Sequence, residues 1–242
     1  MRPQIPWVEQ AQAIPDCPPG LEYLAYVDCL FIKQQVSVLE AFTGFEAANK
    51  YEVVNSLGQR VYLAVEKTDC CTRQCCGNNR PFEVSLYDAY QREVLKVKRY
   101  LRCDSCFFPC CLQKVDILTP NDQLIGSVKQ TWSICVPNYK IRDAQENNVL
   151  SITGPFCTSS CCGDVEFEIL STHGDIKIGT LSKLYSGVIK EAFTDADNFR
   201  VTFPMDLNVT TKASLLGAAL LIDFMFFEKQ QGQGTDGIGM IA

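Results

Sequence analysis

The sequence predicts a mainly β protein, built as a closed barrel of roughly twelve strands around an apolar helix near its C-terminus. Three features predict it: five repeated hairpin patterns, two further strand-like segments, and one segment that is apolar on every side. A chain of 242 residues is long enough to fold as a single domain of this kind. Its 47% apolar and 21% charged residues are typical of a globular protein.

The hairpin patterns each join two runs of β-forming residues through a polar turn. The paired runs are 51–54 with 61–65, 82–86 with 94–97, 115–118 with 124–128, 139–141 with 149–152, and 167–170 with 176–178. Segments 29–32 and 199–203 add two strands. So many strands in one domain favour closure into a barrel, because closure leaves no unpaired edge.

Residues 213–222 break this pattern, since they are apolar all round and must be buried in lipid or in protein. A helix over 213–227 is about 22 Å long, whereas the apolar core of a bilayer is about 30 Å thick. Asp223 also interrupts the run, and an acid deep in lipid costs up to roughly 3 kcal/mol. We therefore predict that the helix fills the barrel, with a membrane span as the alternative.

The expected organisation has three parts. Residues 1–20 hold five prolines without apolar periodicity and are expected to form a flexible arm. Residues 21–228 form the barrel, with its central helix over 211–228. Residues 229–242 are rich in Gln and Gly and are expected to be a disordered tail.

Twelve of the fourteen cysteines lie in the connections between hairpins rather than in hairpin turns. In an up-and-down barrel these connections share one end, so we expect the cysteines to gather at one rim. No signal-peptide pattern occurs near Met1, so we expect a cytosolic chain with reduced thiols.

The cysteine clusters allow three interpretations. Fatty acylation is favoured, because paired cysteines beside Phe107 and Phe108 are typical of a membrane-facing loop and two or more acyl chains anchor a protein stably. A zinc site at the rim and burial of the thiols as small apolar side chains remain alternatives. The residues expected to carry acyl chains are Cys103, Cys106, Cys110 and Cys111.

The remaining signals argue against an enzyme and against a nucleic-acid partner. The net charge of -6 does not suit nonspecific binding to nucleic acid. The lone histidine, His173, falls in a predicted turn, and the glycine-rich segment 232–237 follows no strand and opens no helix. We expect no catalytic residue.

Several stretches, in this order, resemble the phospholipid scramblase family across nearly all of residues 17–228. They are CPPGLEYL at 17–24, NKYE at 49–52, LGQRVY at 57–62, TDCCTR at 68–73, CCGDV at 161–165, AFTDADNF at 192–199 and LIDFMFFE at 221–228. The resemblance implies the tubby-like fold, a twelve-stranded barrel threaded by a C-terminal helix. It also implies calcium-dependent, ATP-independent movement of phospholipids between leaflets, and palmitoylation.

The resemblance further implies a calcium segment that contains Asp195, Asp197 and Asp206. As an EF-hand loop this segment is poor, because Arg200 stands where glycine is needed and two phenylalanines replace oxygen ligands. Residues 199–203 alternate as a strand does. We therefore predict a strand with acidic flanks and weak calcium binding, with a Kd of roughly 10⁻⁴–10⁻³ M.

Two functions stay open. The first is a calcium-responsive scramblase at the cytoplasmic face of the plasma membrane, with membrane phospholipids as partners and homo-oligomers or protein partners as additions. The second is a palmitoylated lipid-binding adaptor or transcription-related regulator without transport activity, found in the cytoplasm or nucleus when it is not acylated.

Overall fold

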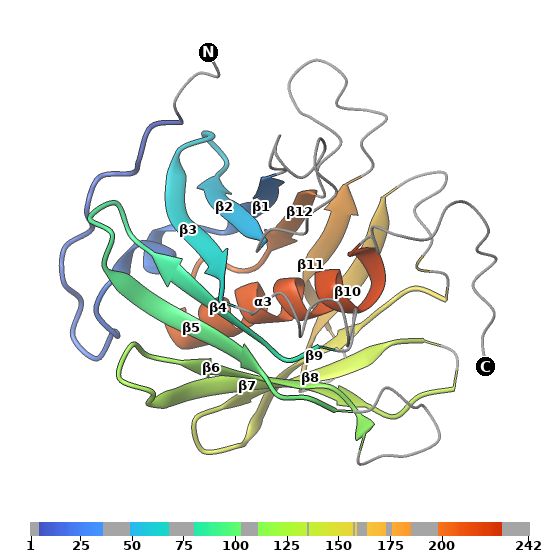
Figure 1. Cartoon of the computed structure of the whole chain (residues 1–242). Coiled ribbons are helices and arrows are strands. Elements are labelled where there is room, and N and C mark those ends of the chain that lie inside the picture. The colour runs from blue at the N-terminus through green and yellow to red at the C-terminus, as the bar shows by residue number, and fades with distance from the viewer. Residues whose placement is uncertain are drawn as a thin grey trace, which may run out of the picture.

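The computed structural model describes residues 5–35, 49–67, 80–102, 111–134, 136–156, 158, 164–172, 176–184 and 198–228. Twelve strands follow one short 3-10 helix and precede one long helix (Figure 1). The elements are η1 (Glu22–Tyr26), β1 (Cys29–Gln35), β2 (Lys50–Asn55), β3 (Arg60–Glu66), β4 (Phe82–Tyr87), β5 (Glu93–Arg99), β6 (Lys114–Leu118), β7 (Leu124–Thr131), β8 (Asn138–Asp143), β9 (Asn148–Thr153), β10 (Val165–Ser171), β11 (Lys177–Leu184), β12 (Asn198–Thr202), α3 (Val209–Ile222) and η4 (Asp223–Phe227).

The strands form one closed antiparallel barrel, which confirms the predicted fold class. Each strand from β2 to β12 pairs with its neighbour in the sequence, and β1 closes the ring by pairing with both β2 and β12. Along β10, Val165, Phe167 and Ile169 are buried, whereas Glu166 and Glu168 are exposed. This alternation places every second side chain in the barrel interior.

Four hairpin turns share one design, although their sequences differ. In three of them the side chain of the first residue, Asn55, Asp88 or Asp143, accepts hydrogen bonds from the backbone N–H groups two and four residues later. Each turn also contains one residue with positive φ, at Gly58, Gln91, Asp122 or Glu146. Asn and Asp favour such turns because their side chains replace missing backbone partners.

These turns lie at one end of the barrel, which we call the hairpin end. The strand order places the ends of β3, β5, β7 and β9 and the starts of β4, β6, β8 and β10 at the opposite end, which we call the rim. The connections between one hairpin and the next therefore start and end at the rim, as predicted.

Helix α3 runs through the middle of the barrel, with strands around it (Figure 1). Its first backbone groups are capped by the Asn208 side chain, which accepts from the Thr210 N–H at 2.8 Å. Every residue from Lys212 to Ile222 is buried, and the helix packs against β6, β7, β8, β12 and η1. The predicted central helix is confirmed, and its packing against the strands explains why it is apolar on all sides.

By length and composition, the segment Val209–Phe227 could also cross a membrane, and it is the one such helix among the described residues. Most of that segment is buried inside the protein. In this structure the helix thus supplies the barrel core, and its apolar side chains are already covered by the strands.

Candidate functional site

The cysteines predicted to be acylated fall in the connection between β5 and β6. Cys103, Cys106 and Cys110 lie outside the described residues. Cys111 is described, is half-buried, and stands three residues before β6 at the rim. Its carbonyl oxygen accepts a hydrogen bond from the Gln113 side-chain amide at 3.4 Å. Acylation of all four residues stays a prediction.

The predicted calcium ligands are distributed around β12. Asp195 and Asp197 lie outside the described residues, whereas Asp206 is exposed in the turn that leads from β12 to α3. Residues 198–202 form an extended strand in which Phe199 and Val201 are buried, as the alternating pattern predicts. An extended strand is not the compact loop of an EF-hand, so a single EF-hand loop through Asp206 is not formed.

Among the described residues, no cluster of three or more His, Cys, Asp or Glu side chains could hold a metal ion. Two further described cysteines, Cys17 and Cys29, are half-buried free thiols, and burial raises the pKa of each. A raised pKa leaves little thiolate, which is the reactive form, so these two thiols are poorly suited to nucleophilic chemistry. His173 lies outside the described residues.

The two ends of the helix are held by buried polar groups, and Lys212 holds the end nearest the hairpin turns. Its side chain is fully buried, and its ammonium donates hydrogen bonds to the carbonyl oxygens of Leu24 (2.9 Å), Val27 (2.9 Å) and Met205 (2.6 Å). Burial lowers the pKa of this ammonium, which the nearby Asp28 and Asp206 oppose. The three carbonyls compensate the buried charge and tie η1 to the helix.

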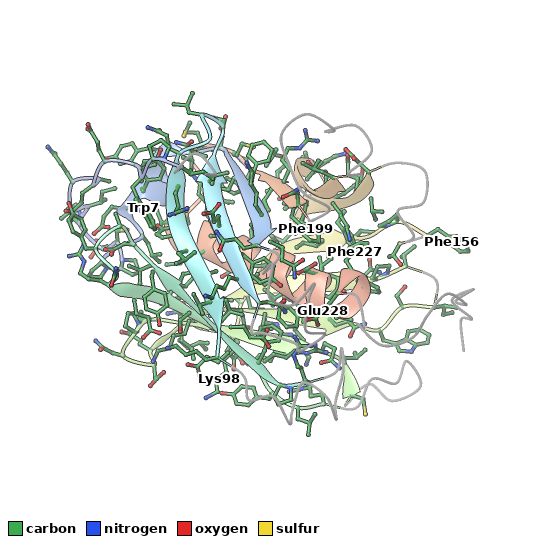
Figure 2. The ribbon with its side chains drawn as sticks, turned by 45° about the horizontal axis from the view of Figure 1, so that its top comes forward. Trp7, Lys98, Phe156, Phe199, Phe227 and Glu228 are labelled. Atoms are coloured by element: carbon green, nitrogen blue, oxygen red, sulfur yellow. The ribbon has the colours of Figure 1, made fainter. Side chains whose placement is uncertain are left out.

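At the rim, the helix ends in an ionic cluster formed by Arg80, Glu66, Glu228 and Asn49. The Arg80 guanidinium donates to Glu66 at 3.1 Å and to Glu228 at 2.7 Å, and the Asn49 amide also donates to Glu228, at 2.7 Å. Burial opposes the charge on Arg80, but its hydrogen bonds to both glutamates outweigh burial and raise its pKa. Figure 2 shows Glu228 directly after the last turn of this helix.

The last helical turn, η4, brings a carboxylate into the core beside this cluster. Asp223 is 2% exposed and accepts a hydrogen bond from the Tyr51 hydroxyl at 2.8 Å. Burial and the neighbouring Asp223 raise the pKa of Tyr51 well above its usual value. The Phe224 ring stacks on Phe82 at 4.2 Å between centroids. Asp223, which argues against a membrane span, therefore has a hydrogen-bond partner inside the barrel.

A cleft of about 540 Å³ opens at the hairpin end, between residues 16–22 and the turns that precede β5 and β7. Its acidic side chains include Glu22 and Asp88, and both are engaged locally. Glu22 accepts from the Gly20 N–H at 2.7 Å, and Asp88 accepts from Arg92 at 2.8 Å. These internal bonds stabilise the walls of the cleft, and its described residues include no group of three or more side chains placed to hold a metal ion.

Comparison with known proteins assigns this barrel to a family. A family model described as Scramblase matches residues 8–229. The chain belongs to the phospholipid scramblase family. It is 52% identical over 224 residues to phospholipid scramblase 1 of Mus musculus, which covers 93% of this chain and 68% of the relative. It is 50% identical over 230 residues to phospholipid scramblase 2 of Bos taurus, covering 95% and 78%.

A third relative, phospholipid scramblase family member 5 of Homo sapiens, is 46% identical over 211 residues, covering 87% of this chain and 78% of the relative. No solved structure matches the chain. The family match confirms the resemblance seen in the sequence motifs, which span the same part of the chain.

In this scramblase-family chain, the buried ionic groups could not be found by sequence reasoning. Arg80 contacts partners that are 14 and 148 residues away, and Lys212 contacts carbonyls up to 188 residues away. The one available signal for Lys212 is its position in the first turns of an otherwise apolar helix, where a lone cation needs buried acceptors.

Proposed function

We propose that this protein is a membrane-associated phospholipid scramblase, which moves phospholipids in both directions across a bilayer without ATP and in response to calcium. The observation that carries the proposal is the match over residues 8–229 to a family whose named relatives are phospholipid scramblases. The proposal involves no catalytic residue, because lipid movement between leaflets makes and breaks no covalent bond.

The filled barrel restricts how lipids can move. Side chains of α3 and of the strands pack the interior, so a phospholipid has no passage along the barrel axis. We therefore propose that lipids move over the outer surface of the protein or between copies of it. The second route requires a homo-oligomer in the membrane.

Membrane attachment is proposed at the cytoplasmic face, through acyl chains on the cysteines of the β5–β6 connection. Two or more chains give stable anchoring, whereas one chain binds only reversibly. Thioester acylation of Cys103, Cys106, Cys110 and Cys111 supplies enough chains without requiring the helix to leave the barrel.

Calcium is proposed to bind weakly next to the start of β12. Asp195 and Asp197 are separated by one residue, so in an extended segment their side chains share one face and can hold one cation. Asp206 follows the other end of the strand, so we give it a secondary part.

A second function is favoured by the filled lumen itself. A barrel without a lipid passage can serve as a palmitoylated adaptor or transcription-related regulator, which binds lipid or protein and moves nothing. This alternative predicts membrane binding without lipid exchange.

Reconstitution separates the two functions. The purified chain is placed in liposomes with a fluorescent phospholipid, and a membrane-impermeant reductant is added with calcium or with a chelator. The proposed function predicts loss of the inner-leaflet signal with calcium only, and loss of that response in Asp195→Ala with Asp197→Ala. Unchanged inner-leaflet fluorescence in all samples would favour the adaptor.

A further inference from the structure

Five of the ten large exposed apolar side chains in the described parts of the chain lie at the rim, directly after three strands. Tyr100 and Leu101 follow β5, Trp132 and Ile134 follow β7, and Phe156 follows β9. Ile134 and Phe156 are 77% and 74% exposed, and Figure 2 shows Phe156 extending away from the barrel. Single exposed apolar residues are normal on a protein surface and also occur in the hairpin turns, so the rim is distinguished by what accompanies them there.

The same three connections carry most of the cysteines. These connections contain eight of the fourteen cysteines, Cys103, Cys106, Cys110, Cys111, Cys135, Cys157, Cys161 and Cys162. A free cysteine is itself a small apolar residue, so the connections combine apolar character with the capacity for acylation.

A row of lysines runs across the outer wall just below this surface. Lys114 on β6 lies opposite Lys129 on β7, and Lys129 lies opposite Lys140 on β8. Like charges that face each other across strands destabilise a sheet. Lys114 pairs with Asp116 at 2.9 Å, whereas no ion pair within the described parts of the chain involves Lys129 or Lys140.

The lysine row stands out because the chain as a whole has a net charge of -6. Lys129 is three residues before Trp132, so about 10 Å of extended chain separates the lysines from the apolar side chains. Lys98 (Figure 2) adds a further cation. Its ammonium lies 5.5 Å from the centroid of the exposed Tyr100 ring. The apolar side chains thus lie farther out from the barrel than the lysines. A bilayer has the matching order, because its acyl chains lie deeper than its phosphates.

We propose that the rim between β5 and β10 docks directly on a bilayer that contains anionic phospholipid. Tyr100, Leu101, Trp132, Ile134 and Phe156 enter the headgroup region, and Lys129 and Lys140 face the lipid phosphates. Trp and Tyr favour this interface because one part of the ring system is apolar and the other is polar. The inference takes its partner, membrane phospholipid, from the proposed function, but it requires no lipid movement.

The charge pattern favours a membrane over a protein partner. The core of a protein–protein interface is depleted in lysine, because a buried ammonium needs a partner. A lipid surface offers phosphates at any position, so it can neutralise a row of lysines without a matched set of acids.

The two tryptophans of the chain provide a direct test, because they lie at opposite ends of the barrel. Trp132 is at the rim, whereas Trp7 lies at the hairpin end, with the Arg60 guanidinium 4.9 Å from its ring. Full-length Trp7→Phe and Trp132→Phe, purified from bacteria without acyl chains, are mixed with vesicles of phosphatidylcholine and phosphatidylserine that carry bromine on their acyl chains. Bromine quenches tryptophan fluorescence on contact. We expect the vesicles to quench the fluorescence of Trp132 in Trp7→Phe and to leave the fluorescence of Trp7 in Trp132→Phe unchanged.

Charge variants test the lysine row by vesicle sedimentation. Lys129→Gln with Lys140→Gln should weaken binding roughly fivefold for each lysine, about 25-fold together. Lys96→Gln with Lys177→Gln removes the same charge from the outer wall nearer the hairpin end and should change binding far less. Vesicles of phosphatidylcholine alone should remove the difference between the two pairs.

Apolar variants test the rim in the same assay. Ile134→Ser with Phe156→Ser should weaken binding, whereas Leu57→Ser with Tyr90→Ser, which are equally exposed in hairpin turns, should not. All four side chains are exposed, so an unchanged midpoint of urea unfolding will show that each variant is folded.

The outcomes separate this inference from the proposed function. Quenching of Trp132 without lipid exchange supports the docking surface and contradicts the scramblase proposal. Lipid exchange with no quenching of Trp132, or with equal quenching of Trp7, overturns the docking surface and leaves the scramblase proposal standing. No binding to vesicles of either composition also overturns the inference and leaves the rim as a protein-binding surface.

Discussion

The position of the helix inside the barrel predicts an energetic coupling between Gly217 on α3 and Ile117 on β6. A Cβ placed on Gly217 would overlap Ile117 Cδ1 and would lie 3.5 Å from Ile117 Cγ1 and 3.6 Å from Val97 Cγ1. Both neighbours are fully buried, so they have little freedom to move. Gly217→Ala therefore adds a methyl group where the strand wall leaves no room for it.

The expected magnitudes follow from two opposed effects. Overpacking costs about 1–3 kcal/mol, whereas replacing glycine by alanine inside a helix stabilises by about 1 kcal/mol. Gly217→Ala alone should thus lower the free energy of unfolding by about 0–2 kcal/mol. Ile117→Val alone removes one buried methyl group and should lower it by about 0.5–1.5 kcal/mol.

The double variant should be close to wild type, because Ile117→Val removes the atom that the new methyl group overlaps. The helix preference of alanine then offsets the lost methyl group, and the coupling energy is about 1–3 kcal/mol. The coupling energy is measured by urea denaturation of the four full-length proteins, monitored by circular dichroism. The m-value should be the same for all four.

A matched control uses Gly58→Ala with Ile117→Val. A Cβ on Gly58 would meet nothing within 4 Å, so its effect comes only from the positive φ at that turn. The two changes should add. If Gly217→Ala and Ile117→Val also add within about 0.5 kcal/mol, the two residues do not touch and the helix is not packed against β6.

Three further predictions concern the rim and the core. Arg80→Met leaves Glu66 and Glu228 without their buried cation and should lower the free energy of unfolding by about 3–5 kcal/mol. Arg92→Met removes an exposed ion pair and should lower it by less than about 1 kcal/mol. Equal losses for the two variants in urea denaturation would contradict the burial of the Arg80 cluster. Tyr51 and Tyr62 have raised pKa values in the folded protein, so their stabilising effect is complete below about pH 10 and is lost above it, as the tyrosines of the unfolded chain ionise. The free energy of unfolding should fall by about 1.4 kcal/mol per pH unit for each tyrosine, and Tyr62→Phe should reduce that slope by one such step; an unchanged slope in alkaline denaturation would refute the assignment. Replacing Cys103, Cys106, Cys110 and Cys111 by serine should move the protein from the membrane to the soluble fraction of cells. Hydroxylamine, which cleaves thioesters, should do the same to the wild type. Retention in the membrane fraction in both experiments would contradict acylation at these residues.

The candidate site was only partly predictable from the sequence. Cys111 and Asp206 are the predicted site residues that the structure describes, and they lie at opposite ends of the barrel. The lysine row was not anticipated, because Lys114, Lys129 and Lys140 become neighbours only through the register of β6, β7 and β8. A one-residue change in the register of a strand turns all its side chains to the other face, and composition does not show which residues of two strands lie opposite each other.

The sequence by itself determined the local structure of this protein. Alternation in runs such as 165–171 specifies strands, Asn55, Asp88 and Asp143 specify turns, and the all-round apolar segment specifies a buried helix, because each pattern acts over a few neighbouring residues. Tertiary structure alone decided the pairing of β1 with β12, the Arg80 cluster and the three carbonyls around Lys212. Those contacts join residues up to 188 positions apart, and they form only because the closed barrel brings its ends and its helix together.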